Sequence, residues 1–174
     1  MVNIILTGFM GTGKSSVGRM LAEKTGYLFC DLDAVIVDQA GKSIKEIFAK
    51  YGEAYFRELE ATAVKQVSSA DRQVIATGGG AVIREDNRCL LRNSGIIVNL
   101  QASIEEICKR LSNDSERPLL HDRNSEEKLA ELLEQRERYY VDADIRIDTT
   151  GRKVEDVVQE ILFILKGKSG FGNS

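Results

Sequence analysis

The chain has 174 residues, of which 43% are hydrophobic and 29% charged, and its formal net charge is -3. This length favours one domain that buries roughly 70% of its unfolded surface, in a globular protein of ordinary composition. The negative charge argues against nucleic acid or an anionic membrane as the main partner. No apolar run approaches the ~20 residues that span a bilayer, and the three cysteines show no CxxC spacing. We therefore expect a protein of the reducing cytoplasm.

Short apolar runs alternate along the chain with longer segments of helical period. We predict β-strands over residues 3–7, 27–30, 73–77, 96–100 and 145–148. This alternation is typical of an α/β fold with a parallel sheet, here of five strands. Because the runs are apolar throughout, we expect helices to cover both faces of the sheet. Helical stripes follow the first strand, at Val17, Met20 and Leu21, and close the chain, from Val154 to Leu165.

Local signals mark two helix starts and two irregular segments. Ser43 with Glu46 and Ser103 with Glu106 match the S-x-x-E capping box, ahead of apolar periodicity. The polar stretch 112–124 holds the only proline and has the length of an active-site lid. The tail 167–174 is rich in Gly, Ser and Lys and is expected to fray, which leaves a single domain over residues 1–166.

Residues 8–15 read G-F-M-G-T-G-K-S and satisfy the phosphate-binding pattern G-x-x-x-x-G-K-[ST] in full. The pattern directly follows the first predicted strand and directly precedes a helical segment, so an incidental glycine-rich turn is the weaker alternative. Backbone N–H groups and Lys14 would bind phosphate oxygens, and the Ser15 hydroxyl would bind Mg²⁺. We predict ATP rather than GTP, because no N/T-K-x-D guanine-binding pattern is found. The expected ATP-binding residues of this motif are Gly11, Thr12, Gly13, Lys14, Ser15 and Ser16.

Two carboxylates, Asp31 and Asp33, end the second predicted strand. Alternation of side chains would place both at the carboxyl end of the sheet, where α/β proteins bind ligands. One of the two could serve Mg²⁺ and the other an acceptor hydroxyl, and we assign the metal to Asp31 with Ser15. The alternative for Asp33 is the N-cap of a helix over residues 34–39.

Two further features would suit an acceptor site. The triple glycine Gly78, Gly79 and Gly80 follows the third strand and would let a ligand lie against bare backbone amides, unless it is only a flexible strand exit. Arg57 lies three residues before Glu60, on one helix face, so the carboxylate could hold the guanidinium for bidentate binding. The alternative for this pair is an ordinary surface ion pair.

In this order and spacing, the motifs closely resemble shikimate kinase, over residues 1 to about 165. The resemblance is carried by Gly8 to Ser15, Asp31-x-Asp33, Ser43-Ile44-x-Glu46-Ile47-Phe48, Gly52-Glu53-x-x-Phe56-Arg57-x-x-Glu60, Gly78-Gly79-Gly80, Arg117-Pro118-Leu119-Leu120 and Arg136. It implies a nucleoside-monophosphate-kinase-like fold with sheet order 2-3-1-4-5. It also implies transfer of the ATP γ-phosphoryl group to the 3-hydroxyl of shikimate, toward aromatic amino acids, with an acceptor-binding region at about 33–60.

The same resemblance implies roles for individual residues. Asp33 would bind the acceptor hydroxyls and act as base, Arg57 and Arg136 would bind the shikimate carboxylate, and Gly79 with its neighbours would contact the ring hydroxyls. From the lid, Arg117 would reach the ATP phosphates. Arg110 and Arg152 would flank the adenine, although a solvated helix residue and a turn charge are equal alternatives for these two.

One departure from the family pattern concerns the second carboxylate-binding arginine. The family usually reads Arg-x-Pro-Leu-Tyr, whereas this chain reads Arg136-Glu137-Arg138-Tyr139-Tyr140, which leaves Arg138 as a rival. The spacing to Tyr140 favours Arg136. Another P-loop small-molecule kinase, such as a gluconate kinase, and a P-loop regulatory ATPase are the competing functions, and we expect a monomer that binds ATP, Mg²⁺ and shikimate.

Overall fold

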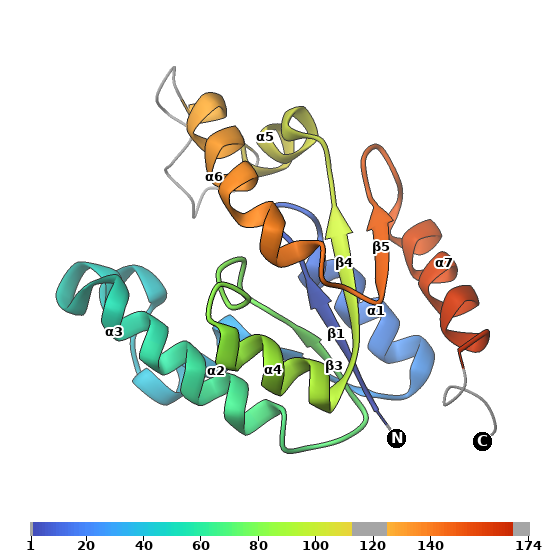
Figure 1. Ribbon diagram of the computed structural model, residues 1–174, viewed down its shortest axis with the longest axis horizontal. Helices are drawn as coiled ribbons and strands as arrows, with labels where there is room; N and C mark the ends of the chain where they lie inside the picture. The colour runs from blue at the N-terminus through green and yellow to red at the C-terminus, as the bar shows by residue number, and fades with distance from the viewer. Residues whose placement is uncertain (1, 113–124, 169–174) are drawn as a thin grey trace.

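Five parallel strands form one sheet in the computed structural model, which describes residues 2–112 and 125–168. The strand order is β2-β3-β1-β4-β5, as the family resemblance implied (Figure 1). The strands are β1 (Asn3–Thr7), β2 (Leu28–Asp31), β3 (Gln73–Ala76), β4 (Gly95–Gln101) and β5 (Ile145–Asp148). All five predicted strands are confirmed, with boundaries that differ by one residue where they differ at all.

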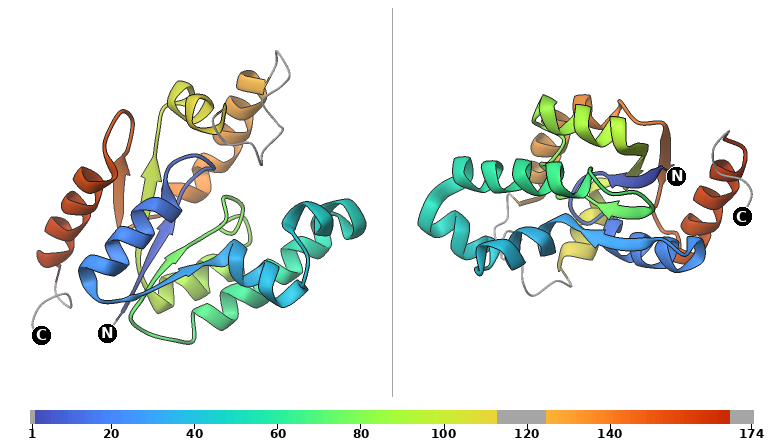
Figure 2. Two further views of the ribbon diagram at one scale, coloured as in Figure 1. Left: turned by 180° about the vertical axis from the view of Figure 1, so that it is seen from behind. Right: turned by 90° about the horizontal axis from the view of Figure 1, so that it is seen from below.

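Helices cover the sheet on both faces and at one end (Figures 1 and 2). They are α1 (Lys14–Thr25), α2 (Leu32–Ala40), α3 (Ile44–Val67), α4 (Glu85–Ser94), α5 (Ile104–Ser112), α6 (Ser125–Tyr140) and α7 (Val154–Lys166). Buried side chains of α1 and α7 pack on one face of the sheet, and those of α2, α3 and α4 pack on the other. Helices α5 and α6 lie beyond the carboxyl ends of the strands, where a third apolar cluster forms.

The central strands alternate their side chains between two cores. In β1, Ile4 and Leu6 join the cluster with α1 and α7, whereas Ile5 joins the cluster with α2 and α3. Both faces of β1 and β3 are therefore buried, as predicted. The prediction is wrong for the edge strands: Leu28 of β2 is 74% exposed, and Arg146 of β5 is exposed between two buried isoleucines. An edge strand lacks a neighbour on one side, so part of its surface stays in water.

The two predicted capping boxes and the alternative cap at Asp33 had mixed outcomes. The Ser43–Glu46 capping box is complete, because each side chain bonds the backbone N–H of the other residue. At α5 the box is only half formed: Ser103 accepts from the Glu106 N–H at 3.2 Å, but the Glu106 carboxylate turns to Arg110 instead. Helix α2 begins at Leu32, and its cap is Asp31 rather than Asp33.

Residues 113–124, which include most of the predicted lid and Arg117, lie outside the described part of the chain, and so do residues 169–174 of the predicted tail. Ser112 ends α5. Among the described helices, none has both the length and the apolarity needed to cross a bilayer.

Candidate active site

The loop between β1 and α1 is shaped by glycine. Gly8 and Gly13 have φ angles of 139° and 94°, in the range that L side chains rarely adopt. A Cβ on Gly8 would also lie 2.2 Å from the carbonyl oxygen of Leu100. Gly13 is the N-cap of α1 and brings no side chain to its first N–H groups, so these can bind an anion.

Side chains of Thr12 and Lys14 donate hydrogen bonds to backbone carbonyl oxygens of the same loop. Lys14 donates from Nζ to the carbonyl oxygens of Gly8 and Phe9, at 2.9 and 2.8 Å. Thr12 is buried and donates its hydroxyl to the carbonyl oxygen of Phe9 at 2.8 Å, so its side chain shapes the loop. Ser15 and Ser16 are exposed on the first turn of α1. All six predicted phosphate-site residues therefore share one loop and helix start.

The two predicted metal ligands meet at this helix start. Ser15 donates its hydroxyl to Oδ2 of Asp31 at 2.8 Å, which joins α1 to the end of β2. The other oxygen of Asp31, Oδ1, accepts from the Asp33 N–H at 3.1 Å. Hydroxyl and carboxylate oxygens beside a phosphate loop are the ligands that Mg²⁺ takes in phosphoryl-transfer sites, so this pair fits that ion.

Arg57 on α3 is held by two carboxylates. Its Nη1 bonds Glu60 at 2.7 Å and its Nη2 bonds Glu53 at 3.1 Å. Glu60 is buried, and burial raises the pKa of its carboxyl, an effect that the nearby Arg57 opposes. The predicted Arg57–Glu60 pair is thus a buried support for the guanidinium, and the surface-pair alternative is wrong for Glu60.

The triple glycine after β3 makes room for these side chains. A Cβ on Gly80 would lie 2.4 Å from Nη1 of Arg57, and one on Gly78 would lie 2.9 Å from Oδ1 of Asp33. None of the three glycines has a positive φ, so they are needed for space rather than for backbone conformation. Asp33 itself lies in the first turn of α2 and not on the strand, so the strand-alternation argument for it is wrong, although the residue does reach this edge of the sheet.

Arg136 and Tyr140 approach the triple glycine from α6. A Cβ on Gly79 would lie 3.8 Å from Nη1 of Arg136, and the Arg136 guanidinium lies 5.9 Å from the ring centroid of Phe9 in the phosphate loop. Tyr140 donates its hydroxyl to the Gly79 carbonyl at 2.5 Å. The rival Arg138 is exposed and bonds the hydroxyl of Tyr139 instead. Of the two arginines, Arg136 is the one beside the triple glycine.

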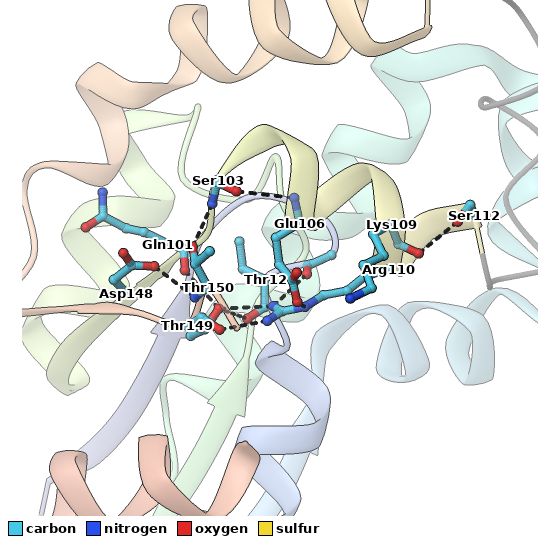
Figure 3. Close-up of polar contacts among 11 residues, drawn as sticks. Thr12, Gln101, Ser103, Glu106, Lys109, Arg110, Ser112, Asp148, Thr149 and Thr150 are labelled. Atoms are coloured by element: carbon cyan, nitrogen blue, oxygen red, sulfur yellow. Dashed lines mark hydrogen bonds and ion pairs between the residues drawn. The ribbon is translucent and has the colours of Figure 1, made fainter. Parts of the chain in front are cut away.

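On the opposite side of the phosphate loop, Arg110 links three segments (Figure 3). Its guanidinium bonds Glu106 on its own helix, the backbone oxygen and hydroxyl of Thr149 after β5, and the carbonyl oxygen of Gly11. Arg152 holds the same turn, through the Asp148 carbonyl at 3.1 Å and Glu160 at 2.6 Å. Neither arginine is a free surface charge, and both border the turn that follows β5.

The model of the shikimate kinase family matches residues 10–166. The chain belongs to the shikimate kinase family. The shikimate kinase of Geobacter metallireducens is 58% identical over 166 residues, which cover 95% of this chain and 93% of the relative. The shikimate kinase of Geobacter sulfurreducens is 58% identical over 159 residues, which cover 91% of this chain and 88% of the relative. Members of this family are ATP-dependent kinases, which agrees with the complete phosphate loop.

Solved shikimate kinase structures have the same fold. The enzyme of Acinetobacter baumannii in complex with shikimate superposes with a TM-score of 0.91 at 40% identity, covering 97% of this chain and 96% of that one. The Aquifex aeolicus enzyme superposes with a TM-score of 0.84 at 36% identity, with 98% and 99% covered. A gluconokinase from Sinorhizobium meliloti, at 0.58 and 19% identity with 91% and 88% covered, shares the fold alone.

Sequence reasoning assigned no role to three residues that shape this candidate site. Glu53 holds Arg57 from one helical turn away, and its i, i+4 spacing is a signal that could have revealed it. Tyr140 served in the sequence analysis only to choose between Arg136 and Arg138. Thr149 had no local signal, because its partners Thr12, Gln101 and Arg110 are distant in sequence.

Proposed function

We propose that the protein transfers the γ-phosphoryl group of ATP to the 3-hydroxyl of shikimate, giving shikimate 3-phosphate and ADP. The observation that carries this proposal is the convergence of Arg57, Arg136 and Asp33 on the triple glycine, beside the phosphate loop. Two cations and a carboxylate around a side-chain-free loop suit an acceptor that has both a carboxylate and hydroxyl groups.

On the acceptor side, Arg57 and Arg136 bind the shikimate carboxylate. Each charge-assisted pair contributes roughly 1.5 to 3 kcal/mol, and Glu53 and Glu60 hold the Arg57 guanidinium ready for it. Gly79, with its neighbours Gly78 and Gly80, contacts the ring hydroxyls. Asp33 accepts a hydrogen bond from the 3-hydroxyl and takes its proton as the new oxygen–phosphorus bond forms.

On the nucleotide side, the backbone of Gly11, Thr12 and Gly13 binds the ATP phosphates, together with Lys14, Ser15 and Ser16. Lys14 exchanges its bonds to the Gly8 and Phe9 carbonyls for bonds to phosphate oxygens. Ser15 and Asp31 would hold Mg²⁺, which neutralises phosphate charge when bound. The bond between the γ-phosphorus and the bridging oxygen breaks, and ADP leaves with that oxygen.

Further proposals concern the periphery of the site. Arg110 and Arg152 flank the adenine, since both border the turn after β5. Arg117, in a lid over residues 112–124, adds positive charge at the transferred group and helps to exclude water. We propose a single kinase domain over residues 1–166 with an acceptor-binding region at about 33–60, acting as a cytoplasmic monomer.

A panel of acceptors tests the proposed reaction. ADP release from Mg-ATP is measured with shikimate, quinate, gluconate and AMP added separately. Shikimate alone should give rapid release, because it matches two guanidinium groups and a hydroxyl-binding carboxylate. Equal or faster turnover with gluconate or AMP would show that another small-molecule kinase activity is the true one. ADP release that no acceptor stimulates would instead support a regulatory ATPase.

A further inference from the structure

Tyr140, the last residue of α6, has a buried phenol with two polar neighbours. The side chain is 2% exposed and belongs to the same apolar cluster as Phe9 of the phosphate loop. Its hydroxyl donates to the carbonyl oxygen of Gly79 at 2.5 Å, across 61 residues of sequence. Burial raises the pKa of this phenol to about 12, and a hydrogen bond from Arg136 opposes the rise. The phenol is therefore neutral at physiological pH, so it keeps the proton that it donates to Gly79.

We infer that Tyr140 is a positioning residue that fixes Arg136 and the triple glycine relative to each other. This inference rests on the proposed function, in which Arg136 binds the shikimate carboxylate and Gly79 borders the ring hydroxyls. The phenol oxygen bonds the Gly79 carbonyl from the helix face that also carries Arg136, so it ties that face of α6 to the triple glycine. Tyr140 itself need not touch the substrate.

The helical spacing explains why a residue at position 140 can fix Arg136 relative to the triple glycine. Arg136 lies four residues before Tyr140, so the two side chains project from the same face of α6, one turn apart. That face meets the phosphate loop, where Arg136 lies over the Phe9 ring and Tyr140 packs in the same cluster. Without the hydroxyl, the Gly79 carbonyl loses a short hydrogen bond, and the helix face that carries Arg136 loses its bond to the triple glycine.

The neighbouring Tyr139 provides a matched control. Its hydroxyl accepts from the exposed Arg138 at 2.7 Å, and the guanidinium groups of Arg88 and Arg138 lie 5.1 and 4.7 Å from its ring centroid. Tyr139 thus has polar neighbours of its own, but its hydroxyl bonds an exposed arginine rather than the triple glycine. Replacing either tyrosine by phenylalanine removes one oxygen and keeps the ring.

The test compares Tyr140→Phe and Tyr139→Phe by steady-state kinetics, with shikimate and ATP varied separately. Tyr140→Phe should raise the KM for shikimate about five- to tenfold, the loss expected for one hydrogen bond to a group that positions a charge. The KM for ATP should stay within about twofold, and Tyr139→Phe should match the wild type in both constants. An unchanged shikimate KM in Tyr140→Phe, or an equal rise in the ATP KM, overturns the inference.

A double-mutant cycle separates positioning from a general structural role. In the background of Arg136→Ala, Tyr140→Phe should raise the shikimate dissociation constant, measured by calorimetry, by less than about twofold, because no guanidinium then remains to be fixed relative to the triple glycine. A full five- to tenfold effect in that background would overturn the inference.

Wild-type protein that does not turn over shikimate contradicts the proposed function and this inference together. Normal wild-type turnover with an unaffected Tyr140→Phe contradicts the inference alone.

Discussion

Glu60 is a buried carboxyl group paired with Arg57, and this pair fixes the position of the guanidinium. One carboxylate oxygen bonds Arg57, and the other, Oε1, has no hydrogen-bond partner among the described residues and faces Gly78. A buried carboxylate is costly unless a cation compensates it, so Glu60 holds the guanidinium where the acceptor is expected. Glu60 thus bonds Nη1 of the Arg57 guanidinium, and Glu53 bonds Nη2.

Arg57→Ala should therefore change both binding and stability. Shikimate binding should weaken about tenfold or more, because one charge-assisted pair is lost. The free energy of unfolding should fall by roughly 3 kcal/mol at most, since Glu60 is left buried and unpaired. Adding Glu60→Gln should restore part of the stability but none of the affinity. Calorimetry with shikimate and urea unfolding measure the two effects.

Arg84→Ala provides the control for this prediction, because Arg84 forms an ion pair of the same length, 2.7 Å, with the exposed Glu58. Its loss should cost less than about 1 kcal/mol and leave shikimate affinity unchanged. If Arg57→Ala binds shikimate like the wild type, the carboxylate role of Arg57 is wrong.

Among the secondary-structure elements, the loop after β3 shows what local sequence can and cannot predict. The pattern of strands and helices, the phosphate loop and the Ser43 cap follow from nearby residues, so the sequence was sufficient for them. The triple glycine was predicted as bare backbone for a ligand, yet part of its space is taken by Arg57 and Asp33. Such contacts depend on how α2 and α3 pack beside β3, which no local pattern contains.

Gly80→Ala tests this use of space. The added Cβ would lie 2.4 and 2.5 Å from the two terminal nitrogens of Arg57, so the guanidinium must move. Because it is the end of a flexible side chain, the protein should still fold. The KM for shikimate should rise about tenfold, as for loss of the Arg57 pair, while the KM for ATP stays within about twofold.

A matched substitution is Gly167→Ala, since a Cβ there would meet only the Ile164 carbonyl oxygen, at an ordinary 3.5 Å. It should leave both Michaelis constants unchanged. A Gly80→Ala variant with wild-type kinetics for shikimate would show that Arg57 does not need the space that this glycine leaves.

Across the whole molecule, the strand order spreads the groups of the candidate site along the carboxyl edge of one sheet. The ends of β2 and β3 contribute Asp31 and the triple glycine on one side of β1, and the turn after β5 contributes the Thr149 network on the other. The sequence predicted each strand, but not the bonds from Arg110 to Thr149 or from Tyr140 to Gly79. The bonded residues are 39 and 61 positions apart in the sequence, so these bonds form only when α5 and α6 pack over the strand ends.

The buried phenol of Tyr140 also affects the stability of the whole molecule at alkaline pH. Burial raises its pKa from 10.0 to about 12, so the folded protein favours the neutral phenol. The resulting stability is fully present below the unfolded-state pKa near 10 and is lost as the pH rises through about 12. At about pH 11 the loss should amount to roughly 1.4 kcal/mol.

Urea unfolding between about pH 8 and 11 measures this loss. The free energy of unfolding should decline more steeply with pH for the wild type and Tyr139→Phe than for Tyr140→Phe, which has no phenol to ionise at that position. Parallel curves for all three proteins would mean that Tyr140 ionises as easily in the folded protein as in the unfolded chain, and that water reaches its hydroxyl.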